Sequence, residues 1–281
     1  MITKRVDLYE YFNKERKENY GGYLEVYAPL ESCAIKENRK RPAILVVPGG
    51  GYSHVSKREA EPIAFRFMAD GFSAFCLEYT VYPNGIYPAQ LLEACMAMAY
   101  IRENADEFEI KKDKISAIGF SAGAHLVSTL HCLYNDEIVK NYLGERASLC
   151  RPDAVIFGYG VLTYDKKAPC GSFRRVSGFN EELAKTLSMD KKINKKVCPA
   201  FLFATFEDTL VPMEHTLKYA TALRKKKIPF EMRIYEKGIH GFSTATGISC
   251  ANARQLLPRA SKWMEDVIAW LYDRDFKIES N

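Results

Sequence analysis

The stretch Gly119-Phe120-Ser121-Ala122-Gly123 joins an apolar run, residues 115–118, to a segment rich in helix formers, residues 122–133. The spacing G-x-S-x-G at such a junction is typical of a tight strand-to-helix turn that raises the serine side chain above the edge of a sheet. Glycine on either side of the serine removes Cβ atoms that would otherwise clash. By itself the pentapeptide could also mark an ordinary turn, so its meaning depends on the rest of the chain.

Short apolar runs alternate with segments of helical period along most of the chain, which is the pattern of a mostly parallel sheet covered by helices. The sequence therefore predicts the α/β class, with about eight strands in a central sheet and helices on both faces. We predict strands at 23–28, 43–47, 73–79, 114–119, 154–159, 200–205 and 230–235, and helices at 57–69, 90–103, 122–133, 213–226 and 251–272.

No internal repeat, low-complexity tract or linker divides the 281 residues. We expect a single domain over residues 1–281, because one large α/β domain can reach this size. The segment 163–196 is polar and poorly periodic apart from a helical island at 181–187. It is predicted to form a small, irregular, cap-like insertion.

The composition narrows the classes of function. Hydrophobic residues make up 47% and charged residues 27%, as in ordinary globular proteins, and the net charge of +5 is small and interspersed. We therefore expect no nucleic-acid partner, since no basic stripe is interleaved with aromatic residues. No apolar run is long enough for a membrane span and the first residues do not resemble a signal peptide, so we expect a cytoplasmic protein with no membrane partner. The eight cysteines lack metal-binding spacings, and we expect them to be reduced, with no metal site.

Two further predicted strands end in side chains that could act together with Ser121. The run 200–205 leads into Glu207 and Asp208, and the run 230–235 leads into the glycine-flanked His240. The order serine, acid, histidine is that of α/β hydrolases, in which the histidine is the general base and the acid orients it. Spacing alone does not separate Glu207 from Asp208, and Asp208 could instead cap a helix that starts near residue 212.

A glycine run, Pro48-Gly49-Gly50-Gly51-Tyr52, follows the predicted strand 43–47. The backbone N–H groups of Gly50 and Gly51, with that of Ala122 directly after the serine, are candidates for an oxyanion hole. The alternative for such a loop is phosphate binding at a helix N-terminus. Against it, the sequence lacks the spacing G-x-x-x-x-G-K-[ST], and no helix is predicted to open at the last glycine.

At these elements the chain resembles the small acetyl-esterase and acetylxylan-esterase group of α/β hydrolases, which is related to the hormone-sensitive-lipase and prolyl-oligopeptidase-like esterases. The resemblance extends roughly over residues 23–271. It rests on Pro-Gly-Gly-Gly-Tyr at 48–52, Glu-Tyr-Thr-Val-Tyr-Pro at 78–83 with Tyr-Pro at 87–88, Gly-Phe-Ser-Ala-Gly-Ala-His at 119–125, Asp-Thr-Leu-Val-Pro at 208–212 and His-Gly-Phe at 240–242.

The resemblance implies an α/β-hydrolase fold and the hydrolysis of short acyl esters, often acetyl groups on sugars or xylo-oligosaccharides, by an acyl-enzyme route without metal or cofactor. It implies Ser121, Asp208 and His240 as catalytic residues, and it favours Asp208 over Glu207 because the group's acid precedes a Val-Pro pair, as Asp208 does here. The wider hormone-sensitive-lipase group has histidine before its glycines, where this chain has Pro48. Which of Gly50 and Gly51 faces the oxyanion therefore stays open.

Four other side chains near these motifs have two interpretations each. Tyr52 and Tyr82 are candidate walls of a substrate pocket, although aromatic residues of this kind also form plain core. His54 could contact substrate or brace the glycine loop. His125 lies one turn after Ser121 and is predicted to pack or anchor the helix rather than act as a base.

Rival functions share the scaffold. A peptidase or amidase of prolyl-oligopeptidase type usually carries a large accessory domain, which we do not expect here because the stretch before the first predicted strand is short. A lipase would need a long amphipathic lid, which the sequence does not indicate. A non-catalytic binding protein is disfavoured by the intact set of serine, acid and histidine. We expect a small-molecule ester as the partner, and a homodimer is compatible with the sequence.

Overall fold

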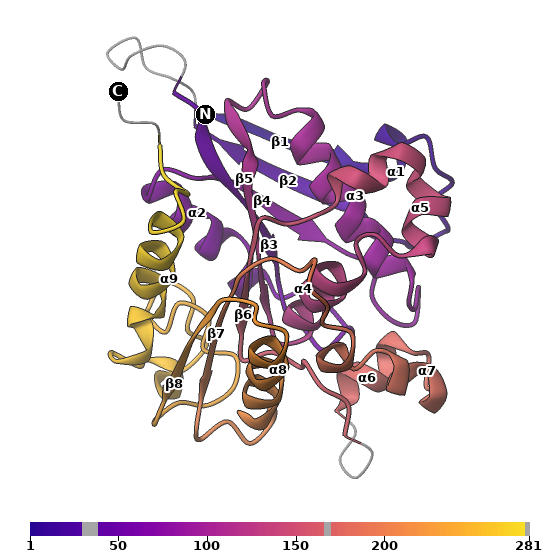
Figure 1. Cartoon of the computed structure of the whole chain (residues 1–281). Coiled ribbons are helices and arrows are strands. Elements are labelled where there is room, and N and C mark those ends of the chain that lie inside the picture. Colours follow the sequence, from indigo (N-terminus) through magenta and orange to yellow (C-terminus); the bar gives the residue numbers. More distant parts are fainter. Residues whose placement is uncertain (30–38, 166–169, 279–281) are drawn as a thin grey trace.

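An eight-stranded sheet runs through the centre of the protein (Figure 1), as described by a computed structural model that covers residues 1–29, 39–165 and 170–278. The strands follow the order β1-β2-β4-β3-β5-β6-β7-β8. β2 pairs antiparallel with β1 and β4, and every other neighbouring pair is parallel. The strands are Ile2–Asp7 (β1), Tyr23–Ala28 (β2), Arg41–Val47 (β3), Ser73–Glu78 (β4), Ile110–Phe120 (β5), Ala154–Gly158 (β6), Ala200–Thr205 (β7) and Phe230–Tyr235 (β8).

Helices cover both faces of this sheet (Figure 1). One face carries α2 and α9, and the other carries the group that includes α3, α4 and α8. The predicted mostly parallel α/β architecture is therefore confirmed. The helices are Leu8–Tyr11 (α1), Glu61–Ala69 (α2), Ala89–Glu103 (α3), Ala122–Leu133 (α4), Glu137–Leu143 (α5), Gly171–Val176 (α6), Glu181–Thr186 (α7), Glu214–Lys225 (α8) and Trp263–Tyr272 (α9).

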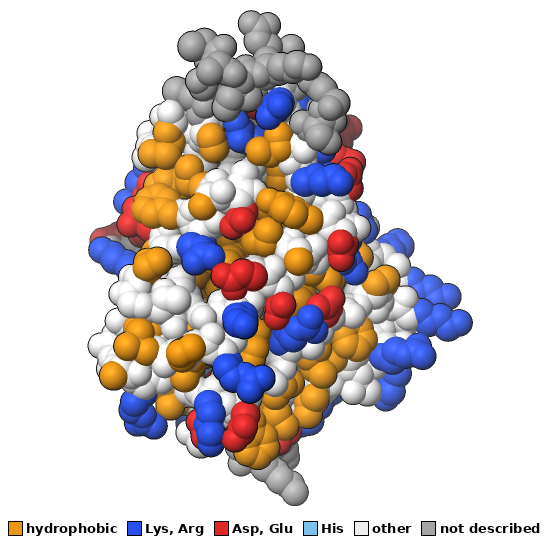
Figure 2. All heavy atoms as spheres, turned by 90° about the vertical axis from the view of Figure 1, so that its left-hand side faces the viewer, with side chains coloured by type: hydrophobic (Ala, Val, Ile, Leu, Met, Phe, Trp, Pro, Cys, Tyr) orange, Lys and Arg blue, Asp and Glu red, His pale blue; other side chains and the backbone are white. Residues whose placement is uncertain are grey.

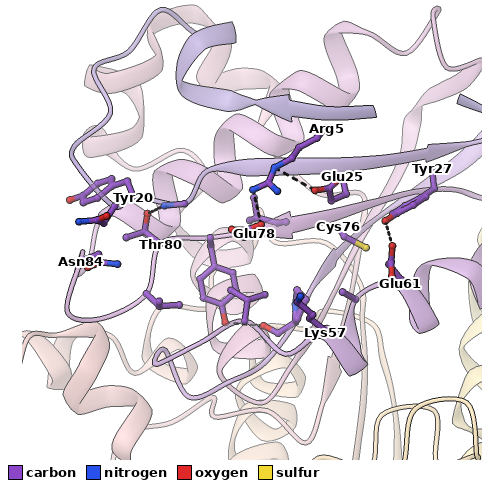
Figure 3. A pocket seen from close by; sticks show the side chains of 18 residues that line it. Arg5, Tyr20, Glu25, Tyr27, Lys57, Glu61, Cys76, Glu78, Thr80 and Asn84 are labelled. Carbon is purple, nitrogen blue, oxygen red and sulfur yellow. Dashed lines mark hydrogen bonds and ion pairs between the residues drawn. The ribbon is translucent and has the colours of Figure 1, made fainter. Parts of the chain in front are cut away.

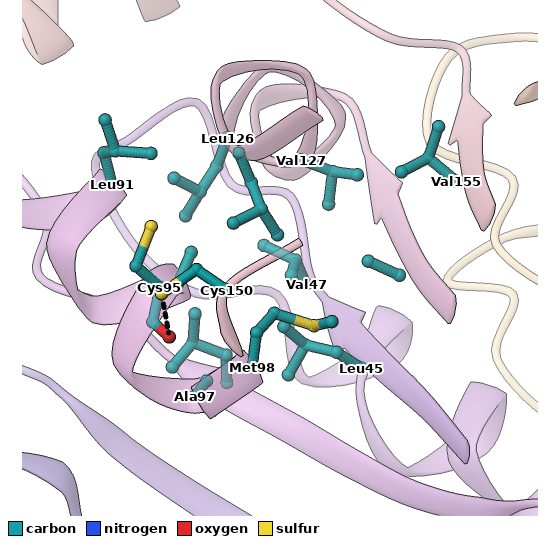
Figure 4. Close-up of a cluster of buried hydrophobic side chains, with 14 of the residues drawn as sticks. Leu45, Val47, Leu91, Cys95, Ala97, Met98, Leu126, Val127, Cys150 and Val155 are labelled. Atoms are coloured by element: carbon teal, nitrogen blue, oxygen red, sulfur yellow. Dashed lines mark hydrogen bonds between the residues drawn. The ribbon is translucent and has the colours of Figure 1, made fainter. Parts of the chain in front are cut away.

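Side chains of the central strands alternate between two buried clusters, as the two-residue period of a strand requires. In β3, Leu45 and Val47 join the cluster under α3 and α4, whereas Ile44 and Val46 join the cluster under α2 and α9. Figure 4 shows part of the first cluster, where Cys150 approaches the backbone oxygen of Cys95 at 3.3 Å. Apolar side chains thus cover both faces of the central strands, and polar side chains that could take part in a reaction are expected at the strand ends.

The surface over α2 and α9 carries basic and acidic side chains interspersed among hydrophobic ones (Figure 2). No helix among the described residues combines the length and the apolar character that crossing a lipid bilayer would require. On this face the charges therefore show the mixed pattern that the composition indicated.

Two of the predicted helices begin with 3₁₀ turns instead of α-helix, and β5 begins at residue 110 rather than at the predicted residue 114. The expected helix over 251–272 is wrong: only α9 is α-helical, and it is preceded by two short 3₁₀ turns, at Ala253–Gln255 and Ala260–Lys262. Pro258 lies between those turns and offers no backbone N–H to a continuous helix. The expected helix over 57–69 likewise begins with a 3₁₀ turn, Lys57–Glu59, before α2.

Four of the described helices and strands were not predicted from the sequence: β1, α1, α5 and α6. β1 is an edge strand in which charged residues interrupt the apolar alternation, a common way to protect a sheet edge. Helices α5 and α6 are short, at seven and six residues, and carry little periodicity. The segment predicted as a cap-like insertion, 163–196, contains α6 and α7, and its residues 166–169 lie outside the described part of the chain.

A buried carboxylate ties the N-terminal elements to α3. Glu93 is fully buried and accepts hydrogen bonds from the backbone N–H of Thr80 at 2.7 Å, from the Thr80 hydroxyl, and from the Tyr9 hydroxyl at 3.0 Å. Burial raises the pKa of Glu93 from its ordinary value of 4.5 to about 7, although the hydrogen bonds oppose that shift.

This shift predicts a specific pH dependence of stability. Between pH 4.5 and about 7 the folded chain keeps the Glu93 proton that the unfolded chain has lost, so the stability contribution is complete below 4.5 and disappears as the pH rises through 7. We expect wild type to lose up to about 3 kcal/mol relative to Glu93→Gln between pH 4.5 and pH 8, measured by urea denaturation. As a control, the difference in stability between wild type and Glu10→Gln, at an exposed position in α1, should not change with pH. A pH-independent difference in stability between wild type and Glu93→Gln would contradict the assignment.

Candidate active site

Ser121 occupies a strained turn between β5 and α4. Its backbone angles are φ 53° and ψ −116°, a region that residues with a Cβ atom rarely adopt. A Cβ atom added to Gly119 would lie 2.3 Å from the Gly123 oxygen, and one added to Gly123 would lie 2.2 Å from the Val47 oxygen. Both flanking glycines are therefore required, because the turn packs backbone against backbone at the end of β3.

His240 and Asp208 converge on this serine. The Nε2 atom of His240 lies 2.8 Å from the Ser121 hydroxyl oxygen, and its Nδ1 atom lies 2.6 Å from Oδ2 of Asp208. The Asp208 side chain is completely buried, and the His240 side chain is 14% exposed. A carboxylate can only accept at Nδ1, so this pairing leaves Nε2 free to accept the serine proton.

The second oxygen of Asp208 is also occupied. Oδ1 accepts the backbone N–H groups of Leu210 at 3.0 Å and Val211 at 2.9 Å, which fixes the carboxylate in its loop after β7. Asp208 is not the N-cap of α8, since that position is held by Met213. Glu207 turns away and binds the Lys237 ammonium and the Gly238 N–H. Of the two candidate acids, only Asp208 contacts the histidine.

The glycine run after β3 folds against the serine. A Cβ atom on Gly49 would lie 3.1 Å from the Ser121 Cβ, and Gly50 and Gly51 adopt positive φ values of 121° and 62°. The Gly50 oxygen accepts the N–H groups of Ser53 and His54, closing a tight turn. Within the described part of the chain, the N–H groups of Gly50, Gly51 and Ala122 have no hydrogen-bond acceptor, so they remain free to bind an oxyanion.

A cavity of about 330 Å³ opens above the serine. Its walls come from the glycine loop, the 3₁₀ turn before α2, the segment around α6, and the loops after β7 and β8. The lining residues are Gly50, Gly51, His54, Ser56, Arg58, Glu59, Ser121, Cys170, Gly171, Ser172, Arg175, Leu210, Val211, His240 and Gly241.

A larger cavity of about 670 Å³ lies near the antiparallel edge of the sheet (Figure 3). Its carboxylates are already engaged: Arg5 reaches Glu25 and Glu78, and the Tyr27 hydroxyl donates to Glu61. None of Ser121, Asp208 and His240 lines it. The smaller cavity is therefore the candidate active site, because it holds the nucleophile and its base.

A buried carboxylate links the glycine loop to the histidine loop. Glu59 accepts the Gly49 N–H at 2.8 Å through Oε2 and the Tyr159 hydroxyl at 2.6 Å through Oε1. The Tyr159 oxygen in turn accepts the N–H of Ser243, and the Tyr159 ring lies 5.1 Å from the His240 ring. This chain of contacts fixes the spacing between the proposed oxyanion donors and the base.

The predicted substrate contacts have different outcomes. His54 lines the cavity and is exposed. Tyr52 does not reach the cavity, which corrects the expectation: its side chain is 1% exposed and its hydroxyl bonds to His125 at 2.8 Å. Tyr82 lies outside the cavity lining, with its ring edge-on against Phe179.

His125 packs, as predicted, rather than acting as a base. Its ring is buried and its Nε2 atom lies 3.0 Å from the Leu187 oxygen. Burial lowers the pKa of His125 to about 4, so the ring stays neutral near neutral pH. Among the described residues, no cluster of His, Cys, Asp or Glu is arranged to hold a metal ion.

Sequence reasoning missed Glu59, Tyr159, Arg58 and Arg175. Arg58 donates to the Gly241 oxygen at 3.1 Å and also to Ser249 and Gln255, so it holds the loop that carries His240. These residues belong to no motif, and each has at least one partner that lies 100 or more positions away in the sequence. No local signal could have identified them.

The chain is similar to several known proteins. A protein-family model described as BD-FAE matches residues 24–223. Endo-1,4-beta-xylanase B of Butyrivibrio fibrisolvens is 34% identical over 83% of this chain and 37% of its own length. The acetylxylan esterase of Xylanibacter ruminicola is 26% identical over 84% of this chain and 48% of its own length. The chain thus spans less than half of either curated relative.

A solved structure extends the similarity over nearly the whole chain. The acetyl ester-xyloside bifunctional hydrolase from Caldicellulosiruptor lactoaceticus has 31% identity and a TM-score of 0.78, covering 91% of this chain and 89% of its own. The likeness therefore covers most of the chain and not only the residues 24–223 that the family model matches.

The link through Glu59 predicts a loss of serine reactivity when it is cut. In Glu59→Gln an amide N–H₂ must face either the Gly49 N–H or the Tyr159 hydroxyl, which leaves a buried donor unpaired. We expect an organophosphorus reagent to phosphonylate Ser121 about tenfold more slowly in this variant, as in Tyr159→Phe. Glu61→Gln, outside the cavity, is the matched control. Labelling of Glu59→Gln at the wild-type rate, with the protein folded, would refute the role.

Proposed function

The chain belongs to the BD-FAE family, and we propose that it is a serine carboxylesterase that hydrolyses short acyl esters, acetyl esters above all. O-acetylated sugars and xylo-oligosaccharides are the proposed natural substrates. The observation that carries the proposal is the continuous contact from Ser121 through His240 to Asp208, at 2.8 Å and 2.6 Å. The names of the acetylxylan esterase and of the acetyl ester-xyloside hydrolase support the choice of substrate.

The proposed reaction starts with Ser121 and His240. As the serine oxygen attacks the ester carbonyl carbon, its proton passes to Nε2 of His240, 2.8 Å away. Asp208 holds Nδ1 and stabilises the imidazolium that forms. The carbonyl oxygen becomes an oxyanion and takes hydrogen bonds from the N–H of Ala122 and from Gly50 or Gly51. Each such donor lowers the barrier by about 3 to 4 kcal/mol.

The second half of the cycle regenerates the serine. The tetrahedral intermediate collapses, the bond to the alcohol oxygen breaks, and His240 donates its proton to that oxygen. A water molecule then attacks the acyl-serine carbonyl while His240 accepts the water proton. The carboxylic acid leaves and Ser121 recovers its proton. Each step uses groups of this chain, so the proposed mechanism needs neither metal nor cofactor.

The cavity supports a small ester. Its volume of about 330 Å³ is near the lower end for small-molecule sites, and the apolar Leu210 and Val211 form part of its wall. An acetyl group with a sugar-sized alcohol suits this space better than a long acyl chain. We therefore propose that the rate falls as the acyl chain lengthens.

Ser121 is the proposed nucleophile, and its removal tests the esterase function directly. We expect Ser121→Ala to lower kcat for p-nitrophenyl acetate by at least about 10⁴-fold, since the acyl-enzyme cannot form. Wild type should be fastest with acetate, slower with butyrate and slowest with octanoate, and should release acetate from acetylated xylo-oligosaccharides. Equal rates in wild type and Ser121→Ala would exclude Ser121 and favour a binding protein with the same fold.

Substitution of each candidate acid in turn separates Asp208 from Glu207. Asp208→Asn puts an amide at Nδ1 of His240 and favours the wrong tautomer, so kcat should fall by about 10³- to 10⁴-fold. Glu207→Gln is the matched control, because Glu207 binds Lys237 and Gly238 among the described residues and does not contact His240 there, and it should hydrolyse p-nitrophenyl acetate at about the wild-type rate. A larger loss in Glu207→Gln than in Asp208→Asn would reverse the assignment.

A further inference from the structure

Arg175 places a guanidinium in the wall of the candidate active site. It comes from α6, in the segment predicted as an insertion, and its Nη1 donates to the backbone oxygen of Gly51 at 3.2 Å. Two glycines leave room for it: a Cβ atom on Gly51 would lie 3.4 Å from Nη1, and one on Gly171 would lie 3.1 Å from it. The guanidinium thus lies directly beside the loop proposed to bind the oxyanion.

Toward the described residues, Arg175 uses little of its hydrogen-bonding capacity. Its single acceptor among the described residues is the Gly51 oxygen, and it forms no ion pair within that part of the chain. Arg58, the other arginine that lines the cavity, differs because it donates to Gly241, Ser249 and Gln255 and is committed to holding the histidine loop. A guanidinium with free N–H donors beside a nucleophile can bind a planar anion through two parallel hydrogen bonds.

The acidic groups near the cavity do not neutralise Arg175 by contact. Both oxygens of Glu59 are taken by Gly49 and Tyr159. Asp208 is buried and accepts from His240, Leu210 and Val211. The two carboxylates are therefore sealed into the wall, whereas the Arg175 cation is partly exposed and lines the cavity.

We propose that Arg175 binds a carboxylate on the alcohol part of the substrate, so that the preferred substrate is an acetyl ester of a hydroxy acid, such as an acidic sugar. This inference rests on the proposed esterase function. Because an acetyl group carries no ionisable group, the anion must belong to the alcohol part of the ester. A carboxylate bound there would hold the alcohol while His240 protonates its departing oxygen.

The test compares two acetyl esters of nearly equal size, 4-acetoxybenzoate, which carries a carboxylate, and the neutral 4-acetoxybenzamide. The readout is the ratio of kcat/KM for the anionic ester to that for the neutral ester. The variants are Arg175→Gln and Arg175→Lys. Arg174→Gln is the matched control, since Arg174 is the exposed neighbour on α6 and does not line this cavity.

We expect Arg175→Gln to lower that ratio about ten- to hundredfold, chiefly through KM of the anionic ester. Arg175→Lys should restore part of it, because the charge returns without the paired geometry. Added NaCl should lower the wild-type ratio, and Arg174→Gln should keep it.

An unchanged ratio in Arg175→Gln, even with both rates reduced, would overturn the proposal and leave Arg175 as a brace for Gly51. Failure of the esterase function itself would be visible separately. In that case wild type would not hydrolyse even the neutral p-nitrophenyl acetate, or Ser121→Ala would hydrolyse it equally well.

Discussion

The close approach of three backbones around Ser121 is the constraint on which the rest of the site depends. The first turn of α4 lies so near the ends of β3 and β5 that positions 119 and 123 have no space for a Cβ atom. Ser121 then adopts its positive φ, and its N–H bonds to the Gly158 oxygen of β6. A turn held on three sides by strands of a buried parallel sheet cannot relax, so the strain is supported by the packing of the whole core.

The parallel sheet also explains why the other groups converge. Ser121, Asp208 and His240 follow β5, β7 and β8, whose carboxyl ends share one edge of the sheet. Loops at such an edge are not held by the hydrogen bonds of the sheet, and here buried polar contacts fix their positions. Glu59 accepts hydrogen bonds from Gly49 of the glycine loop and from Tyr159, and Arg58 donates a hydrogen bond to Gly241, directly after His240. The polar groups that position the chemistry are thus nearly all satisfied inside the protein.

The sequence predicted the elements whose signals are local. The bounds of β2, α4, β7 and β8 match the expectation, because each is a compact run of apolar or helix-forming residues between clear breaks. The serine, acid and histidine followed from their order and from the strand ends on which they lie. The choice of Asp208 over Glu207 needed either the family resemblance or the structure, because adjacent residues at a strand end differ only in the direction their side chains take.

What the sequence could not reveal depends on contacts between distant segments. Tyr52 stands next to the glycine run, yet its positive φ of 59° goes with a ring that lies in the core against His125. Glu59 and Arg175 lie in short helical stretches without a distinctive motif. Their roles become visible in the contact of Glu59 with Tyr159, 100 residues away, and in that of Arg175 with Gly51, 124 residues away.

The groups that line the cavity come from two parts of the chain. The sheet and its loops carry Ser121, Asp208 and His240 together with the residues that hold them in place. Arg175 instead reaches the cavity from the segment around α6. If Arg175 binds the alcohol as we propose, a substitution in that segment would alter which alcohol is bound while Glu59, Tyr159 and the turn at Ser121 keep their contacts. In the proposed enzyme, chemistry and selectivity therefore belong to different parts of the chain, and these parts are in contact where Arg175 donates to the Gly51 oxygen.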